Sequence, residues 1–180
     1  MKAVFLDSQT FSTDISFSAI EQHVKTLTCY SITTAEQVIE HCQNTDVVIT
    51  NKVILSAEIL AQLPQLKLIC ISATGYNNVD IAAAQKHNIA VTNVSGYAGS
   101  SVAQYVFSQL LEYYQQTSHH NANTQQGLWQ QSNTFCYHGN AITALAGKTL
   151  SIIGYGNLGQ AVAKIANAFD MNVLISERPN

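Results

Sequence analysis

The stretch that most constrains the fold is a glycine-punctuated turn near the end of the chain, in "LSIIGYGNLGQAVAKIA" (150–166). An apolar run typical of a buried strand leads into the spacing G-x-G-x-x-G, and an amphipathic helical pattern follows it. In a βαβ unit the first glycine permits the tight turn, the second lets a pyrophosphate approach, and the third lets helix and strand pack closely. The helix also directs unpaired N–H groups and the positive end of its dipole toward the phosphates. The predicted nucleotide contacts in this turn are Gly154, Tyr155, Gly156, Asn157, Leu158 and Gly159.

Such a motif alone is a weak signal, because an ordinary strand-to-helix turn can also be rich in glycine. The residues that follow it favour nucleotide binding: a second apolar strand, "NVLIS", leads to Glu177, 21 residues beyond Gly156. An acidic side chain at this distance can accept hydrogen bonds from a ribose diol. Glu177 favours NAD over NADP because a carboxylate repels a 2′-phosphate. Adjacent Arg178 could instead attract that phosphate, or it is a solvated tail residue, so NADP stays open.

The first hundred residues alternate short apolar runs with helical patterns. The expected strands are 2–7, 27–32, 46–50, 66–72 and 89–94, and the expected helices are 17–26, 34–42, 56–63 and 80–88. Runs rich in valine, isoleucine and leucine that are separated by helices indicate parallel strands covered on both faces. Right-handed crossovers then make a flavodoxin-like, doubly wound α/β domain the natural solution.

The pattern changes after residue 99. Apolar residues recur at helical spacing over 100–116, which predicts one long helix. The next segment, 117–140, is polar and weakly periodic, and we expect a loop that wraps a neighbouring surface with Trp129 as its anchor. His119 and His120 are then expected just beyond the negative end of the long helix, where imidazoles are favourable.

A domain boundary is expected near residues 94–100. It divides the chain into a first domain, 1–98, and a second domain, 99–180, which would contain only a connecting helix, a loop and one βαβ unit.

The composition argues against some classes of binding partner and indicates the compartment in which the protein is found. Apolar residues make up 47% of the chain and charged residues 11%, which is typical of a globular protein and not of a disordered one. A net charge of −3 gives no general attraction to nucleic acid or to a membrane surface, and no apolar run approaches a membrane span. The four cysteines have no CxxC spacing, which favours free thiols in a reducing, cytoplasmic compartment.

Three stretches give the chain a family resemblance: "SATGYNNVDIAAAQKHNIAVTNVSGY" (72–97), "SSVAQYVF" (100–107) and "GKTLSIIGYGNLGQAVA" (147–163). In this order they resemble the D-isomer-specific 2-hydroxyacid dehydrogenases, particularly the glycerate dehydrogenase/hydroxypyruvate reductase branch. The resemblance implies an outer substrate domain, the first βαβ unit of a Rossmann NAD-binding domain, and a homodimer. It covers about the first half of a full family member, so we expect an N-terminal part of the enzyme.

The resemblance also implies substrate contacts. Backbone N–H groups of Thr74, Gly75 and Tyr76 would hold the substrate carboxylate, because a nest of N–H groups suits an anion. The alternative interpretation of "TGYNN" is a turn that leads into a helix capped by Asp80, and both can hold together.

Three further positions match family contacts. Asn51 and Lys52 match a loop at the edge of the substrate cleft, although Lys52 is equally well explained as a solvated surface charge. Val102 would lie near the nicotinamide, whereas without the resemblance it would be a core residue. Ser95 stands where proline is frequent in the family, and Gln104 replaces a frequent glutamate. Neither departure argues against membership.

The chain is expected to lack the reacting groups themselves. Reducing a 2-keto acid requires a hydride donor, a cation and a proton donor, which in the family are the cofactor, an arginine and a glutamate–histidine pair. These side chains fall beyond the stretch present here, and the sole arginine, Arg178, is placed at the adenosine end of the cofactor. We therefore expect no catalytic residue, no metal site and no turnover in the 180-residue chain alone.

The functional hypothesis is an NAD(H)-dependent oxidoreductase that interconverts a small 2-keto acid, hydroxypyruvate or glyoxylate-like, and its D-2-hydroxy acid. The alternative is a non-catalytic NAD-sensing or interaction protein on the same scaffold. A methyltransferase with a similar glycine turn fails on motif order, because such a motif usually opens its domain.

Overall fold

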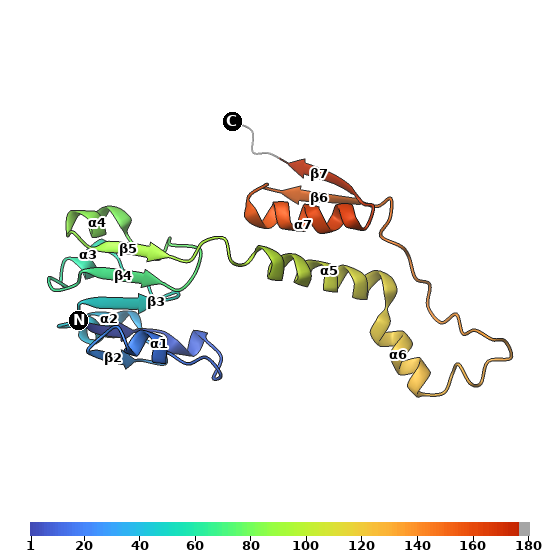
Figure 1. The fold of residues 1–180 in the computed structure, drawn as a ribbon, viewed down its shortest axis with the longest axis horizontal. Helices are drawn as coiled ribbons and strands as arrows, with labels where there is room; N and C mark the ends of the chain where they lie inside the picture. Colours follow the sequence, from blue (N-terminus) through green and yellow to red (C-terminus); the bar gives the residue numbers. More distant parts are fainter. Residues whose placement is uncertain (177–180) are drawn as a thin grey trace. The chain divides into compact units, whose positions relative to one another are not determined.

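The structure is a computed structural model that describes residues 1–176. The chain divides into two compact units, Met1–Ser95 and Gly96–Asn180, which we call the first unit and the second unit and describe separately (Figure 1). Within the described residues, no helix combines the length and the apolar character that crossing a membrane requires.

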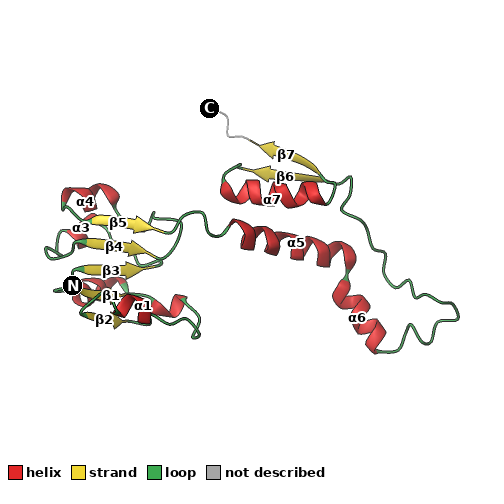
Figure 2. Ribbon diagram, in the orientation of Figure 1, coloured by secondary structure: helices red, strands yellow, loops and turns green. Residues whose placement is uncertain are grey.

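The first unit is built on a five-stranded parallel sheet (Figure 2). Its strands are β1 (Lys2–Phe5), β2 (Thr26–Cys29), β3 (Val47–Thr50), β4 (Leu68–Ile71) and β5 (Ala90–Asn93). They are ordered β2-β1-β3-β4-β5, which is the flavodoxin-like order. The predicted doubly wound domain is confirmed, and the carboxyl ends of all five strands lie along one edge.

Helices cover both faces of this sheet. They are α1 (Ser18–Glu21), α2 (Val38–Cys42), α3 (Ala57–Leu60) and α4 (Ile81–Lys86), with short 3-10 turns η1 (Ser8–Thr10) and η2 (Ala35–Gln37). Successive side chains of a strand point to opposite faces. Accordingly Val4 and Leu6 join the core beneath α2, α3 and α4, whereas Ala3 and Phe5 pack on the other face with residues of α1. Side chains on both faces of the sheet are therefore removed from water.

The second unit contains the predicted βαβ unit and the long helix that precedes it. Its elements are α5 (Gly99–Gln115), α6 (Thr117–Gln125), β6 (Thr149–Ile153), α7 (Asn157–Ala168) and β7 (Asn172–Ser176). Strands β6 and β7 pair in parallel, with α7 as their crossover. α7 packs against α5, where Phe107 is stacked on Phe169 with ring centroids 5.4 Å apart. Ala166 and Met171 complete this small core with Leu145.

The expectation of a loop over all of 117–140 is wrong at its beginning, because α6 is helical. Gln116 adopts a left-handed conformation (φ 49°) and ends α5 there. The Glu112 carboxylate then accepts hydrogen bonds from the Thr117 hydroxyl and the Ser118 N–H, so it satisfies donors at the start of α6. A polar helix held by such local bonds has no apolar face for periodicity to detect.

Two smaller expectations concern the same segment. His119 and His120 follow α5 as expected, but the dipole argument is wrong, because both lie in the first turn of α6, near the positive end of its dipole. Trp129 is 55% exposed, and its indole N–H donates to the Phe135 carbonyl 3.1 Å away. This hydrogen bond joins two residues of the same segment, and the role of Trp129 as an anchor on a neighbouring surface stays a prediction.

Candidate functional site

The glycine turn connects β6 to α7, and its three glycines meet three different requirements. Gly154 has a φ of +91°, a conformation that side chains with a Cβ rarely adopt. A Cβ at Gly159 would collide with the Gly154 carbonyl oxygen and lie 3.2 Å from Ile152 Cγ2, so α7 approaches the strand only because this Cβ is absent. At Gly156 the position of a Cβ has no atom within 4 Å, which leaves open space beside the helix N-cap.

Unpaired donors surround this open space. The Gln160 N–H donates to the Gly156 carbonyl at 2.9 Å, which is the first bond of the α7 ladder. Before it, the N–H groups of Gly156, Asn157 and Leu158 have no acceptor among residues 1–176, as expected at a helix N-terminus. Together with the helix dipole, these donors favour an anion such as a pyrophosphate. The side chains of Tyr155 and Leu158 are both exposed beside the turn.

Three other predicted cofactor contacts are placed differently. Glu177 and Arg178 lie outside the described residues, so their predicted contacts with the ribose stay predictions. Val102 lies in the first turn of α5 and is 37% exposed, whereas Ala103 on the same helix is buried. The interpretation of Val102 as a core residue is therefore wrong, and its contact with a nicotinamide stays a prediction.

In the first unit, the two predicted substrate segments follow neighbouring strands at the same sheet edge. Asn51 and Lys52 come directly after β3, and 74–76 follows β4, its neighbour in the sheet. The Asn78 side chain donates to the Val53 carbonyl at 3.0 Å and ties the two loops together. The carboxyl edge of a parallel sheet is the usual place for a ligand in this fold.

The loop at 74–76 combines an open backbone with a supported frame. The N–H groups of Thr74, Gly75 and Tyr76 donate to no acceptor within the described part of the chain. The Asn93 side chain, from the end of β5, donates to the Thr74 carbonyl at 2.8 Å. The loop leads into α4, where Asp80 accepts the Ala83 N–H at 2.8 Å, so the expected helix cap is confirmed.

Sequence reasoning assigned no role to Asp7, which follows β1 at the same sheet edge. Asp7 is 6% exposed, and its carboxylate accepts the Asn51 N–H at 2.9 Å, the Lys52 N–H at 2.7 Å and the Thr50 hydroxyl at 3.3 Å. The backbone donors of Asn51 and Lys52 are therefore occupied, and only their side chains are available to a ligand. In the sequence, only the position of Asp7 points to a role, because it is an acidic residue at the end of an apolar strand.

Across residues 1–176, no group of three or more histidine, cysteine, aspartate or glutamate side chains is placed to hold an ion. Two features within the described residues present free backbone donors that suit an anion, the start of α7 and the 74–76 loop. Both are built from main chain, so an anion would be held there by N–H groups and not by a charged side chain.

Comparisons with known proteins identify the family to which this chain is similar. The family model "D-isomer specific 2-hydroxyacid dehydrogenase, catalytic domain" matches residues 5–171. A putative 2-hydroxyacid dehydrogenase of Haemophilus influenzae is 42% identical over 177 residues, 98% of this chain and 56% of its own length. A glycerate dehydrogenase of Methylorubrum extorquens is 36% identical over 173 residues, 96% of this chain and 54% of its own.

A solved structure shares the fold as well. The NAD-dependent formate dehydrogenase of Staphylococcus aureus in complex with NAD is 25% identical, with a TM-score of 0.67 over 97% of this chain and 56% of its own. The chain thus spans about half the length of the curated relatives that it matches. The family match covers both units and most of the described residues. The chain therefore belongs to the D-isomer specific 2-hydroxyacid dehydrogenases.

Proposed function

We propose that this protein is an NAD(H)-dependent oxidoreductase that interconverts a small 2-keto acid and its D-2-hydroxy acid, with hydroxypyruvate and glycerate favoured. The observation that carries the proposal is the β6–α7 turn, where each of three glycines meets a separate requirement of a pyrophosphate site. The similarity to a glycerate dehydrogenase supports this substrate class.

In this proposal the second unit binds the cofactor. The N–H groups of Gly156, Asn157 and Leu158 would hold the pyrophosphate, with the open space at Gly156 as its approach. Glu177 would accept the ribose hydroxyls and so favour NAD, and NADP stays possible through Arg178. Bound NAD(H) would accept or supply the hydride. The related formate dehydrogenase was solved with NAD, which supports the same choice.

The first unit binds the acid in this proposal. The free N–H groups of Thr74, Gly75 and Tyr76 would hold its carboxylate, because a backbone nest binds an anion without a cationic side chain. The Lys52 and Asn51 side chains extend from the neighbouring loop and would contact the remainder of a small polar substrate. We further propose that the family's arginine, glutamate and histidine are not among these 180 residues, so this polypeptide alone does not turn over substrate.

We propose a cytoplasmic homodimer formed through the second unit. Between α5 and α7 the surface has a groove of about 760 Å³ whose lining includes Phe107, Leu111 and Ile165. An apolar groove of this kind is suited to cover by another subunit. Within the described residues all four cysteines are free thiols, which supports a reducing compartment.

The test is to express the protein from its complete gene and titrate it with NADH and NADPH, then assay hydroxypyruvate and glyoxylate. We expect saturable NADH binding and loss of NADH absorbance when the keto acid is added. A folded preparation that binds neither dinucleotide would contradict the proposal. Binding without turnover of any 2-keto acid would favour the alternative, a non-catalytic NAD-sensing or interaction protein. Oligomeric state is measured on the same sample by light scattering.

A further inference from the structure

Asp7 occupies the position in the first unit where the strand order reverses, between the carboxyl ends of β1 and β3. In sheets with this strand order, ligands bind at that switch point. Here the position holds a side chain of the protein itself, 6% exposed and hydrogen-bonded to the loop that follows β3.

The loop after β3 has the geometry of an anion nest. The N–H groups of Asn51 and Lys52 both donate to the Asp7 carboxylate, at 2.9 Å and 2.7 Å. The next N–H, that of Val53, donates at 3.0 Å to the hydroxyl of Thr50, and this hydroxyl in turn donates to Asp7 at 3.3 Å. Successive N–H groups that converge on one anion form a binding concavity. In this molecule the group bound in the concavity is the Asp7 carboxylate, which belongs to the chain itself.

The loop after β4 provides the contrast. Its consecutive N–H groups at 74–76 have no internal acceptor within the described residues, although the loop lies at the same edge beside the loop after β3. A ligand carboxylate that meets this edge therefore finds one nest filled and one open. The filled nest also fixes the main chain from which the Lys52 side chain extends, because the Lys52 N–H donates to Asp7.

We propose that Asp7 is a positioning residue of the substrate site. Its carboxylate holds the 50–53 loop in the conformation that presents the Asn51 and Lys52 side chains, and it keeps external anions out of the switch-point nest. The substrate carboxylate is thereby directed to the 74–76 loop. The part that concerns substrate rests on the proposed function, whereas the occupation of the nest is independent of it.

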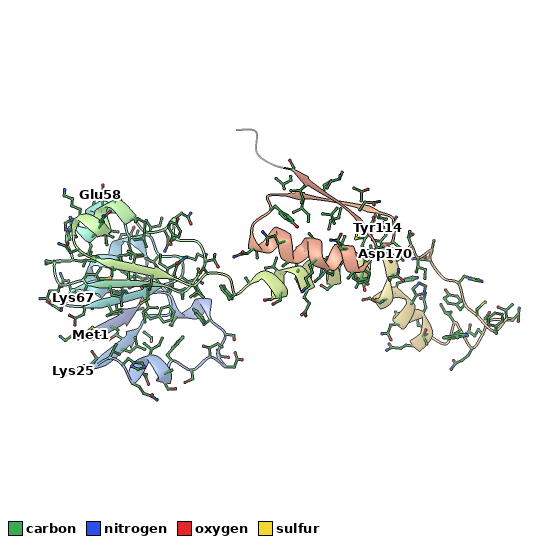
Figure 3. The ribbon with its side chains drawn as sticks, turned by 45° about the horizontal axis from the view of Figure 1, so that its top comes forward. Met1, Lys25, Glu58, Lys67, Tyr114 and Asp170 are labelled. Atoms are coloured by element: carbon green, nitrogen blue, oxygen red, sulfur yellow. The ribbon has the colours of Figure 1, made fainter. Side chains whose placement is uncertain are left out.

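The test uses the full-length protein with Asp7→Ala, Asp7→Asn and a matched control, Asp46→Ala. Asp46 precedes β3 at its opposite end, where it accepts the Lys2 N–H and pairs with Lys67, both at 2.8 Å. Lys67 lies at the amino-terminal edge of the sheet (Figure 3). In Asp7→Ala we expect the KM for the keto acid to rise roughly 10- to 100-fold, with a smaller change in kcat, because a displaced positioning group has effects of this size.

Formate is the probe for the nest itself. In Asp7→Ala the N–H groups of Asn51 and Lys52 lose their acceptor, and formate should refill the space, lower the raised KM and increase Tm by about 3 °C or more. In the wild type and in Asp46→Ala we expect a smaller Tm response and only competitive inhibition. Asp7→Asn keeps the shape, so we expect a milder rise in KM and no specific response to formate.

Each outcome decides the proposal. A folded Asp7→Ala with an unchanged KM overturns the positioning role, and a formate response no larger than that of the wild type overturns the nest. If the wild type turns over no keto acid, the proposed function fails, while the Tm comparison still decides whether Asp7 fills an anion nest. If Asp7→Ala folds only in formate, the nest is supported, and an unchanged KM in Asp7→Asn then overturns the role of the charge.

Discussion

Replacing Gly159 by alanine tests whether α7 depends on a close approach to β6. The added Cβ would meet the Gly154 carbonyl oxygen and lie 3.2 Å from Ile152 Cγ2. Overpacking costs about 1–3 kcal/mol, while alanine in place of glycine returns up to about 1 kcal/mol of helix propensity. Because the colliding atom belongs to the backbone and cannot rotate away, we expect Gly159→Ala to lower the free energy of unfolding by about 2 kcal/mol.

Gly156→Ala is the matched control for this substitution. Its Cβ would enter open space at a φ of −78°, which alanine adopts freely, and loss of glycine at an N-cap costs less than about 1 kcal/mol. The same Cβ would occupy the path of the proposed pyrophosphate. We therefore expect NADH affinity to fall at least about tenfold, or ~1.4 kcal/mol, while stability is nearly unchanged.

Both variants are measured in the same two assays. Urea unfolding is followed by circular dichroism and by fluorescence of Trp129, the only tryptophan of the chain, which lies in the second unit. NADH binding is measured by calorimetry. If Gly159→Ala is as stable as the wild type, the close-packing argument fails. If Gly156→Ala binds NADH with wild-type affinity, the open space beside α7 is not the phosphate site.

Three further predictions concern the first unit. Asp80→Ala removes the cap on α4 and should lower the free energy of unfolding by about 0.5–2 kcal/mol in urea, whereas Ser56→Ala, where no side-chain cap bond exists, should cost less than about 0.5 kcal/mol. Burial raises the pKa of the Cys42 thiol to about 12, so a thiol reagent at pH 8 should modify Cys42 only after unfolding. Partial burial and Glu21 also raise the pKa of Cys29, but this thiol is exposed and should react slowly in the native state. Hydrogen bonds from Lys67 and from the backbone lower the pKa of Asp46. A depressed carboxyl pKa stabilises the fold above about pH 4 and not below the native pKa, so the stability difference between wild type and Asp46→Asn should shrink as pH falls below about 4 in an acid titration.

Local sequence signals predicted those parts of the fold that depend on a few neighbouring residues. The glycine turn and the Asp80 cap are both local, because each requires only a residue type at a fixed offset. Helix lengths were less predictable. A helix was expected over 17–26, but α1 occupies only Ser18–Glu21, because residues from Thr26 onward pair with β1 as a strand. Tertiary pairing there overrides the helical pattern.

The 117–125 segment shows a different limit. Periodicity detects a helix through its buried face, and α6 has almost none, since Asn123 is its only buried residue within the described structure. What starts α6 is the left-handed residue Gln116 and the carboxylate of Glu112 one turn earlier. A glutamine in this conformation has no sequence signature, because the usual residue at such a position is glycine or asparagine.

The role of Asp7 depends on long-range register and so has no local signature at all. Phe5 pairs with Ile49 across β1 and β3, and this register brings the carboxylate within 2.7 Å of the Lys52 N–H, 45 positions later in the chain. A slip of one residue would send the side chains of β1 to the opposite faces of the sheet and leave the loop donors without their acceptor. The apolar pattern of both strands resists that slip, because Val4 and Phe5 are buried on opposite faces. The substrate-side geometry of this unit is therefore a consequence of core packing, and core variants that weaken register should disturb the 50–53 loop before they unfold the sheet.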